Sequence, residues 1–174
     1  MARVGYVQLY GAGSCALVSL TRQALRDLER TEESLNQLEW MLDDLPPVLK
    51  PLVHRGFRAR MGIGLRELQE HLEGVHAVLR DLDRACLGQD EETFLDNAQA
   101  LLDLHESTAR ILNMFLTNLA DLPREVRETT ADEDANRGAE EIVDKHADAV
   151  ATLLTTLDMV RSTLKKQTGL TSSG

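Results

Sequence analysis

The stretch FLDNAQALLDLHESTARILNMFLTNLADL, residues 94–122, decides the fold class of this chain. Its apolar side chains recur at alternating spacings of four and three residues, which places them on one face of a helix. The positions on this stripe are Phe94, Ala98, Leu101, His105, Thr108, Leu112, Phe115, Leu119 and Leu122. A seven-residue repeat of this kind predicts a long helix that packs against partner helices with a gentle left-handed supercoil.

The same alternation runs through three further segments, Leu17 to Leu45, Met61 to Cys86 and Ala139 to Leu164. We therefore expect helices over residues 14–45, 57–87, 90–122 and 132–167. Short connections between them favour antiparallel neighbours, so the prediction is an all-α, antiparallel four-helix bundle with long heptad-patterned helices. The side chains expected in its core are Leu35, Leu72, Leu101, Leu112, Leu153 and Leu157.

Proline and glycine mark where these helices should stop. Pro46, Pro47 and Pro51 end the first helix because proline lacks the amide hydrogen and clashes with the preceding turn, leaving at most a helical turn at 48–53. Gly88 occupies the place of a left-handed cap after the second helix, and Pro123 should close the third helix or open the next turn. The domain organisation expected is a short N-terminal arm at 1–13, the bundle at 14–167 and a flexible tail at 168–174.

Composition narrows the classes of function. The chain has 174 residues and a formal net charge of −10, so we expect neither nucleic-acid binding nor binding to anionic lipid. The basic cluster at 54–60 should be a solvent-exposed turn. No apolar run reaches the roughly 18 residues that span a membrane, and no signal peptide is recognisable at the start. We therefore expect a cytoplasmic protein without membrane insertion.

No motif supports catalysis, so the expectation is that the protein is not an enzyme. The segment 11–16 has the glycines of a dinucleotide-binding loop, but no second strand follows it. Glu73 and His76 match one Glu-x-x-His element of di-iron bundles, which need two such elements. His71-Leu72-Glu73-Gly74 resembles part of the motif of histidine phosphotransfer domains, with different spacing and without their lysine. A phosphorelay module would need an exposed, reactive histidine.

Two histidines replace leucine on the stripes, and they are the candidate site. Reflecting each helix across its connection predicts that His105 and His146 share one core layer with Thr31. His71, Glu73 and Glu32 should lie at its edge. Two imidazoles inside a bundle can ligate a metal or a haem iron. The alternative is a pair of neutral histidines that bond to hydroxyls, carbonyls or water and fix the helix register.

Two classes of function follow from these patterns. The first is a non-enzymatic scaffold or protein–protein interaction module without a cofactor, which binds a protein partner or self-associates. The second is a small metal- or haem-binding bundle that uses His105 and His146. The pattern also places Cys15 and Cys86 at the same end of an antiparallel pair, within reach of a disulfide, although a reducing cytosol favours two free thiols.

Overall fold

The computed structural model describes residues 12–48, 50–88, 91–129 and 131–171. Within these ranges the side chains of 12–15, 41–42, 57, 60–61 and 129 lie outside the description. The described chain is all-helical, with no strand, and has five helices. They are α2 (Ala12–Asp43), α3 (Lys50–Met61), α4 (Leu65–Leu87), α5 (Glu91–Thr129) and α6 (Glu133–Thr168).

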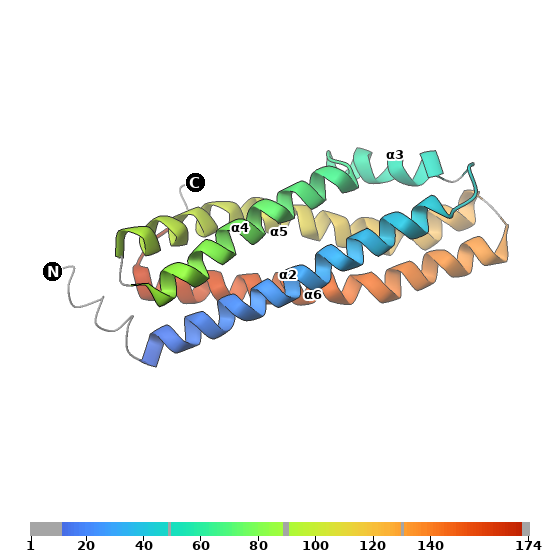
Figure 1. Cartoon of the computed structure of the whole chain (residues 1–174). Helices are drawn as coiled ribbons and strands as arrows, with labels where there is room; N and C mark the ends of the chain where they lie inside the picture. Colours follow the sequence, from blue (N-terminus) through green and yellow to red (C-terminus); the bar gives the residue numbers. More distant parts are fainter. Residues whose placement is uncertain (1–11, 49, 89–90, 130, 172–174) are drawn as a thin grey trace.

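The four long helices lie side by side, and each runs opposite to its neighbours (Figure 1). α2 packs against α4 and α6, and α5 also packs against α4 and α6. Polar contacts fix the pairing of α2 with α4, since Arg22 Nε donates to Asp83 Oδ1 at 3.1 Å and Gln69 Nε2 to Asn36 Oδ1 at 2.9 Å. The longest helix, α5, has 39 residues, which corresponds to about 58 Å at 1.5 Å per residue.

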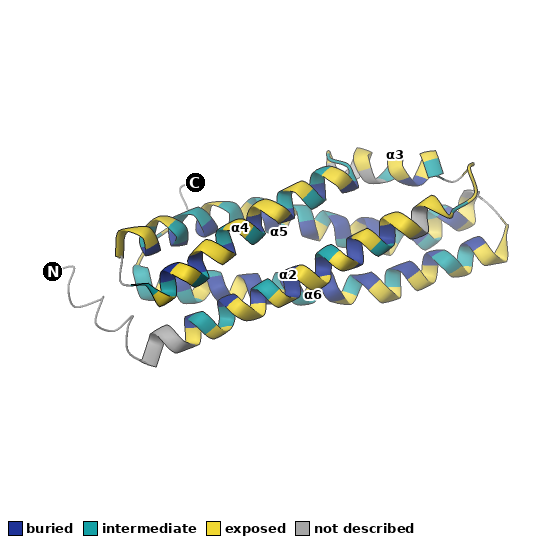
Figure 2. Ribbon diagram, in the orientation of Figure 1, coloured by how far each residue is buried: buried dark blue, intermediate teal, exposed yellow. Residues whose placement is uncertain are grey.

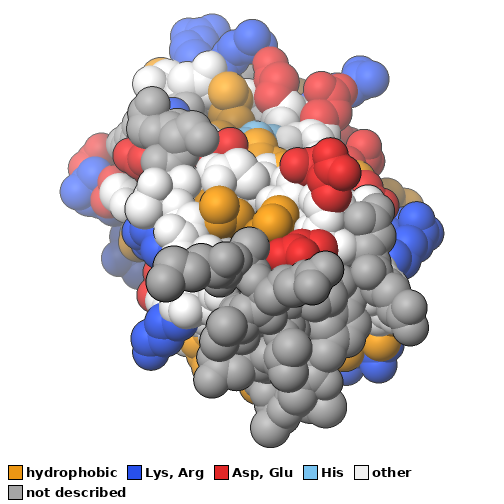
Figure 3. Space-filling model, turned by 90° about the vertical axis from the view of Figure 1, so that its left-hand side faces the viewer, with side chains coloured by type: hydrophobic (Ala, Val, Ile, Leu, Met, Phe, Trp, Pro, Cys, Tyr) orange, Lys and Arg blue, Asp and Glu red, His pale blue; other side chains and the backbone are white. Residues whose placement is uncertain are grey.

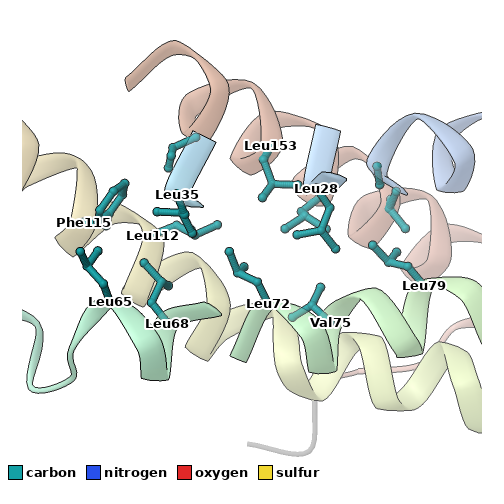
Figure 4. Packing of buried hydrophobic residues seen from close by; sticks show 14 of the residues in the cluster. Leu28, Leu35, Leu65, Leu68, Leu72, Val75, Leu79, Leu112, Phe115 and Leu153 are labelled. Carbon is teal, nitrogen blue, oxygen red and sulfur yellow. The ribbon is translucent and has the colours of Figure 1, made fainter. Parts of the chain in front are cut away.

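The core lies between these four helices, where buried and exposed positions alternate along every helix (Figure 2). All six leucines predicted for the core are buried, and none is more than 3% exposed. Leucines from all four helices and Phe115 from α5 point toward one another in the interior (Figure 4). Every position of the 94–122 stripe is buried as well, so the heptad pattern identified the inward face of α5 correctly.

The short helix α3 is a difference from the predicted count of four helices. Pro51 is its second residue, in the first turn, where the missing amide hydrogen breaks no helical hydrogen bond. Val53 anchors the helix because its side chain is only 6% exposed, and α3 packs mainly on α5. The basic cluster at 54–60 is therefore helical rather than a turn. Gly62, with φ +70°, then separates α3 from α4.

The helix α5 continues through Pro123, where we expected it to end. Leu122 and Val126 are both 2% exposed, so the helical turns around the proline bury apolar surface. Such burial offsets a penalty of about 3 kcal/mol for an interior proline. Arg127, beyond the proline, forms an ion pair with Glu140 of α6. The two additional turns move the connection between α5 and α6 toward the C-terminus.

The other helix ends can be assigned to particular residues. Asp132 caps α6, as its side chain accepts a hydrogen bond from the Asp134 amide at 3.0 Å. Gly88 ends α4 as expected, but in an extended conformation (φ −82°, ψ 173°) rather than the left-handed one. The left-handed cap is instead Gly169, with φ +69°, whose amide donates to the Lys165 carbonyl at 3.0 Å.

Most of the predicted N-terminal arm, residues 1–11, lies outside the described residues. The predicted tail is held at its start, because the Leu170 side chain packs on the core cluster and Gln99 Nε2 donates to the Thr171 carbonyl at 3.0 Å. At this end of the molecule, acidic and basic side chains surround a few exposed hydrophobic ones (Figure 3). Among the described residues, no helix is both long and apolar enough to cross a membrane.

Candidate functional site

His146, one of the two predicted core histidines, lies in the contact between α6 and α2. His146 is only 1% exposed, and its Nδ1 forms a hydrogen bond with Ser34 Oγ of α2. One turn before Ser34, Thr31 Oγ1 donates to the Asp27 carbonyl at 2.8 Å and approaches the Ala149 carbonyl at 3.4 Å. His146 and Thr31 therefore share a region of the core, as expected.

His105, the other core histidine, is also buried but lies elsewhere. Its Nε2 is 3.8 Å from Asp158 Oδ1 on α6, which is twelve residues beyond His146 and so about 18 Å further along the helix. The displacement follows from the longer α5. With α5 ending at Thr129 and α6 beginning at Glu133, the connection is centred on residue 131, which sets His105 opposite residue 157. The predicted shared layer is thus not observed.

The further residues predicted as metal ligands, His71, Glu73 and Glu32, do not lie together with His105 and His146. His71 Nε2 is 2.8 Å from Thr108 Oγ1 and ties α4 to α5, while Glu73 is exposed. Glu32 instead lies 3.3 Å from His76 Nδ1, and Glu29 is 3.6 Å from His76 Nε2. In the part of the chain that the structure describes, no group of three or more His, Cys, Asp or Glu side chains is suited to hold a metal ion.

The protonation of the core histidines follows from their burial. Burial lowers the pKa of His71, His105 and His146 below the ordinary 6.5, because the charged ring loses its hydration. Arg161 lowers the pKa of His105 further, while Asp158 opposes it, and Lys145 adds to the lowering at His146. The rings are therefore mostly neutral at pH 7, and those of His71 and His146 act as hydrogen-bonding groups.

Three buried polar contacts join α2 to α6, and we call them the polar seam: Asp27 with Thr156, Thr31 with Ala149, and Ser34 with His146. Thr156 Oγ1 donates to Asp27 Oδ2 at 2.6 Å, and both residues are 6% exposed. Buried polar contacts of this kind fix which residues of two helices face one another, because a shifted register would leave them without partners. The polar seam therefore sets the alignment of the first and last helices.

The Ser34–His146 pair does not have the arrangement of a hydrolase. A nucleophilic serine needs a histidine that a third group orients through its other nitrogen, and also donors for the oxyanion. His146 Nε2 has no hydrogen-bond partner among the described residues, and Ser34 is only 9% exposed. The pair thus supports a structural role in the polar seam.

Outside the core, the most unusual feature is the exposure of Trp40, whose residue is 79% accessible to solvent. It lies on the outward side of α2 with Glu33, Asn36 and Gln37, and we call these four residues the Trp40 face. They line an open hollow of about 410 Å³ with Lys145 of α6. A smaller hollow of about 250 Å³ adjoins it and has Ser34 and His146 among its lining residues.

The Trp40 face was not predicted from the sequence, because it lies outside the inward stripes that indicated the candidate site. Trp40 falls two residues after the stripe position Leu38, about 200° around the helix from it, which already indicates the solvent side. It is also the only tryptophan in the chain. A large aromatic side chain on the polar face of an amphipathic helix is therefore the signal that could have identified this surface.

Acidic side chains surround the Trp40 face. Glu33 belongs to it, Glu39 precedes the tryptophan, and Asp43 and Asp44 follow within one helical turn. All four are exposed, and none forms an ion pair within the described residues. The surface thus combines an apolar ring with more negative than positive charge, since Lys145 is the only basic residue that lines the hollow in the described part of the chain. This combination suits contact with a basic partner.

Comparisons with known proteins add no information on function, since no protein family, curated protein or solved structure matches this chain.

Proposed function

We propose that the protein is a non-enzymatic scaffold or protein–protein interaction module, and that its contact surface is the Trp40 face. In this proposal the four long helices form the expected four-helix bundle, with α3 added at one end, and hold the surface rigid. The observation that carries the proposal is the 79% exposure of Trp40. Tryptophan is enriched among the residues that dominate binding energy in protein interfaces.

The character of the surface favours a protein partner over the other classes. The acidic surroundings of Trp40 and the net charge of −10 repel nucleic acid and anionic lipid. The metal- or haem-binding alternative has no contact in its favour, because His105 lies beside Asp158, about 18 Å along α6 from His146. The buried histidines instead contribute to a defined helix register, which a scaffold requires.

Site-specific photo-crosslinking tests the proposal. A photoreactive phenylalanine analogue replaces Trp40 in one variant and Arg110 in a control variant, because Arg110 is exposed on α5, the helix diagonally opposite α2. We expect discrete crosslinked products from position 40 and none from position 110 when the variants are irradiated in cells. Equal products from both positions, or none from position 40, would contradict the proposed surface.

A second readout uses the native side chain. Since Trp40 is the only tryptophan, its emission reports on this surface alone. At low concentration the isolated protein should show the red-shifted emission of a hydrated indole, and addition of a crosslinked partner in purified form should shift the emission to the blue. A partner that binds without changing the emission contacts another surface.

A further inference from the structure

Three exposed apolar residues lie close together in sequence at one end of the molecule. Among the described residues, the large hydrophobic side chains that are exposed are Trp40, Val48, Leu52, Leu87 and Met159. The first three fall within thirteen residues of sequence, between the last turns of α2 and the first turn of α3, and are 79%, 75% and 45% exposed. Clustered exposed apolar residues of this kind mark interaction surfaces more often than isolated ones do.

The charges near these exposed residues differ between α2 and α3. The acidic residues Glu33, Glu39, Asp43 and Asp44 surround Trp40 on α2. By contrast, α3 carries basic residues and no acidic one. Within the described residues Arg58 forms an ion pair with Glu67 of α4 at 3.4 Å, whereas Lys50 and Arg55 form none.

Among the described residues, no ion pair joins the acidic residues of α2 to the basic residues of α3 within one chain. α3 packs mainly on α5, where Val53 is buried and Gly56 approaches closely, since a Cβ there would meet Glu125 Oε2 at 3.4 Å. The Trp40 face lies on the exposed side of α2, where Lys145 of α6 lines the hollow beside it. Two complementary surfaces therefore lie at the same end of the molecule without neutralising each other.

We propose that the occupant of the Trp40 face is α3 of a second copy of this chain, in a reciprocal two-fold dimer. This inference rests on the proposed function and names its partner. Arg55 of one protomer lies against the indole of its partner, while Lys50 faces the acidic end of α2. Val48 and Leu52 are covered by the same contact. A two-fold axis repeats the contact, because each protomer supplies one basic and one acidic surface.

A second copy fits better than an unrelated anion or cation. A purely anionic partner, such as a lipid surface, would meet Asp43 and Asp44 beside the basic helix. A purely cationic partner would leave Lys50 and Arg55 unneutralised. A second copy of the chain places opposite charges against both the acidic and the basic surface. The dimer should therefore weaken as salt screens these exposed charges.

Charge reversal in two complementary variants tests the dimer. The first variant carries Lys50→Glu and Arg55→Glu on α3, and the second carries Asp43→Lys and Asp44→Lys on α2. Each variant alone presents like charges at both contacts, so sedimentation velocity should show it to be monomeric, with self-association weakened roughly tenfold or more. An equimolar mixture has opposite charges at both contacts and should form the heterodimer.

The controls separate this inference from the proposed function. Circular dichroism confirms that both variants remain helical, and Arg110→Glu on the far side should leave the wild-type dimer intact. In the wild type and the mixture, Trp40 emission should shift to the blue as concentration rises and return in high salt. Trp40→Ala should weaken association without changing the fold.

Several results would overturn the second copy as the occupant. One is a wild type that stays monomeric at low salt up to hundreds of micromolar, and another is a mixture that does not reassociate. If the wild type is monomeric but Trp40 crosslinks a different protein, this inference fails and the proposed function stands. If a monomeric wild type changes its Trp40 emission only with anionic lipid vesicles, both fail in favour of a membrane surface.

Discussion

Mild acidification should destabilise the protein through two buried histidines, His105 and His146, and the partly buried His71. The pKa values of His71, His105 and His146 are below 6.5 in the folded state because burial disfavours the charged ring. In the unfolded chain the rings return to about 6.5, so below that pH the unfolded state binds protons that the folded state does not. The free energy of unfolding is therefore unaffected by the protonation of these histidines above about pH 6.5. It decreases as the pH falls from there through the pKa values of the folded state.

The size of the effect follows from proton linkage. Between the folded and unfolded pKa values, each histidine changes the free energy of unfolding by up to about 1.4 kcal/mol per pH unit. Replacing His146 with Leu removes one of the three contributions, so the slope between pH 6.5 and 5.5 should fall by up to that amount. At pH 7.5 the same variant should lose little stability, because Leu fills the apolar layer while one hydrogen bond of about 0.5–1.5 kcal/mol is lost.

Ser34→Ala is the matched control for His146→Leu. It removes the partner of His146 Nδ1 but keeps the buried ring, so it should cost about 1–3 kcal/mol at pH 7.5 and retain the wild-type slope. Urea unfolding followed by circular dichroism at pH 7.5, 6.5 and 5.5 measures all three proteins. The reasoning is refuted if the wild type is equally stable across this range, or if His146→Leu keeps the full pH slope.

Three further predictions concern single positions. Gly74→Ala should stabilise the protein by roughly 0.5–1 kcal/mol, because an added Cβ at this helical site meets nothing within 4 Å. Gly169→Ala should destabilise it by about 1 kcal/mol, because φ is +69° there, and thermal melts compare the two variants. Thr156→Val should lower the free energy of unfolding in urea by about 1–3 kcal/mol, because it leaves Asp27 Oδ2 without its hydrogen bond. A double variant with Asp27→Leu should recover part of this loss. Burial and a neighbouring carboxylate raise the pKa of Cys86 to about 11, so alkylation of this thiol, followed by mass spectrometry, should be slow at pH 8 and accelerate toward pH 11; rapid labelling at pH 8 would contradict the burial.

The inward faces of the long helices could be predicted from the sequence, because hydrophobic periodicity records burial directly. Leu72, Leu112 and Leu153 were expected in the core and are buried there. The heptad pattern does not encode how far each helix continues past a proline. At Pro123 the burial of Val126 decides the question, and this is a tertiary property that a local sequence rule cannot see.

The error at Pro123 explains why the candidate site was only partly predicted. Extending α5 shifts its pairing with α6 by about nine residues, so His105 faces Asp158 rather than the neighbourhood of His146. The individual assignment of both histidines to buried positions was nevertheless confirmed. Whether Cys15 approaches Cys86 stays a prediction, since the side chain of Cys15 lies outside the described residues. Cys86 is a half-buried free thiol.

The polar seam also determines how the molecule would respond to mechanical force. α2 begins and α6 ends at the same end of the molecule, and the two helices are antiparallel neighbours (Figure 1). Tension applied to these two ends therefore peels the helices apart from one end instead of shearing them lengthwise. Advancing separation would break the Asp27–Thr156 contact first and the Ser34–His146 contact last, so the load falls on one contact at a time and the helices part at low force.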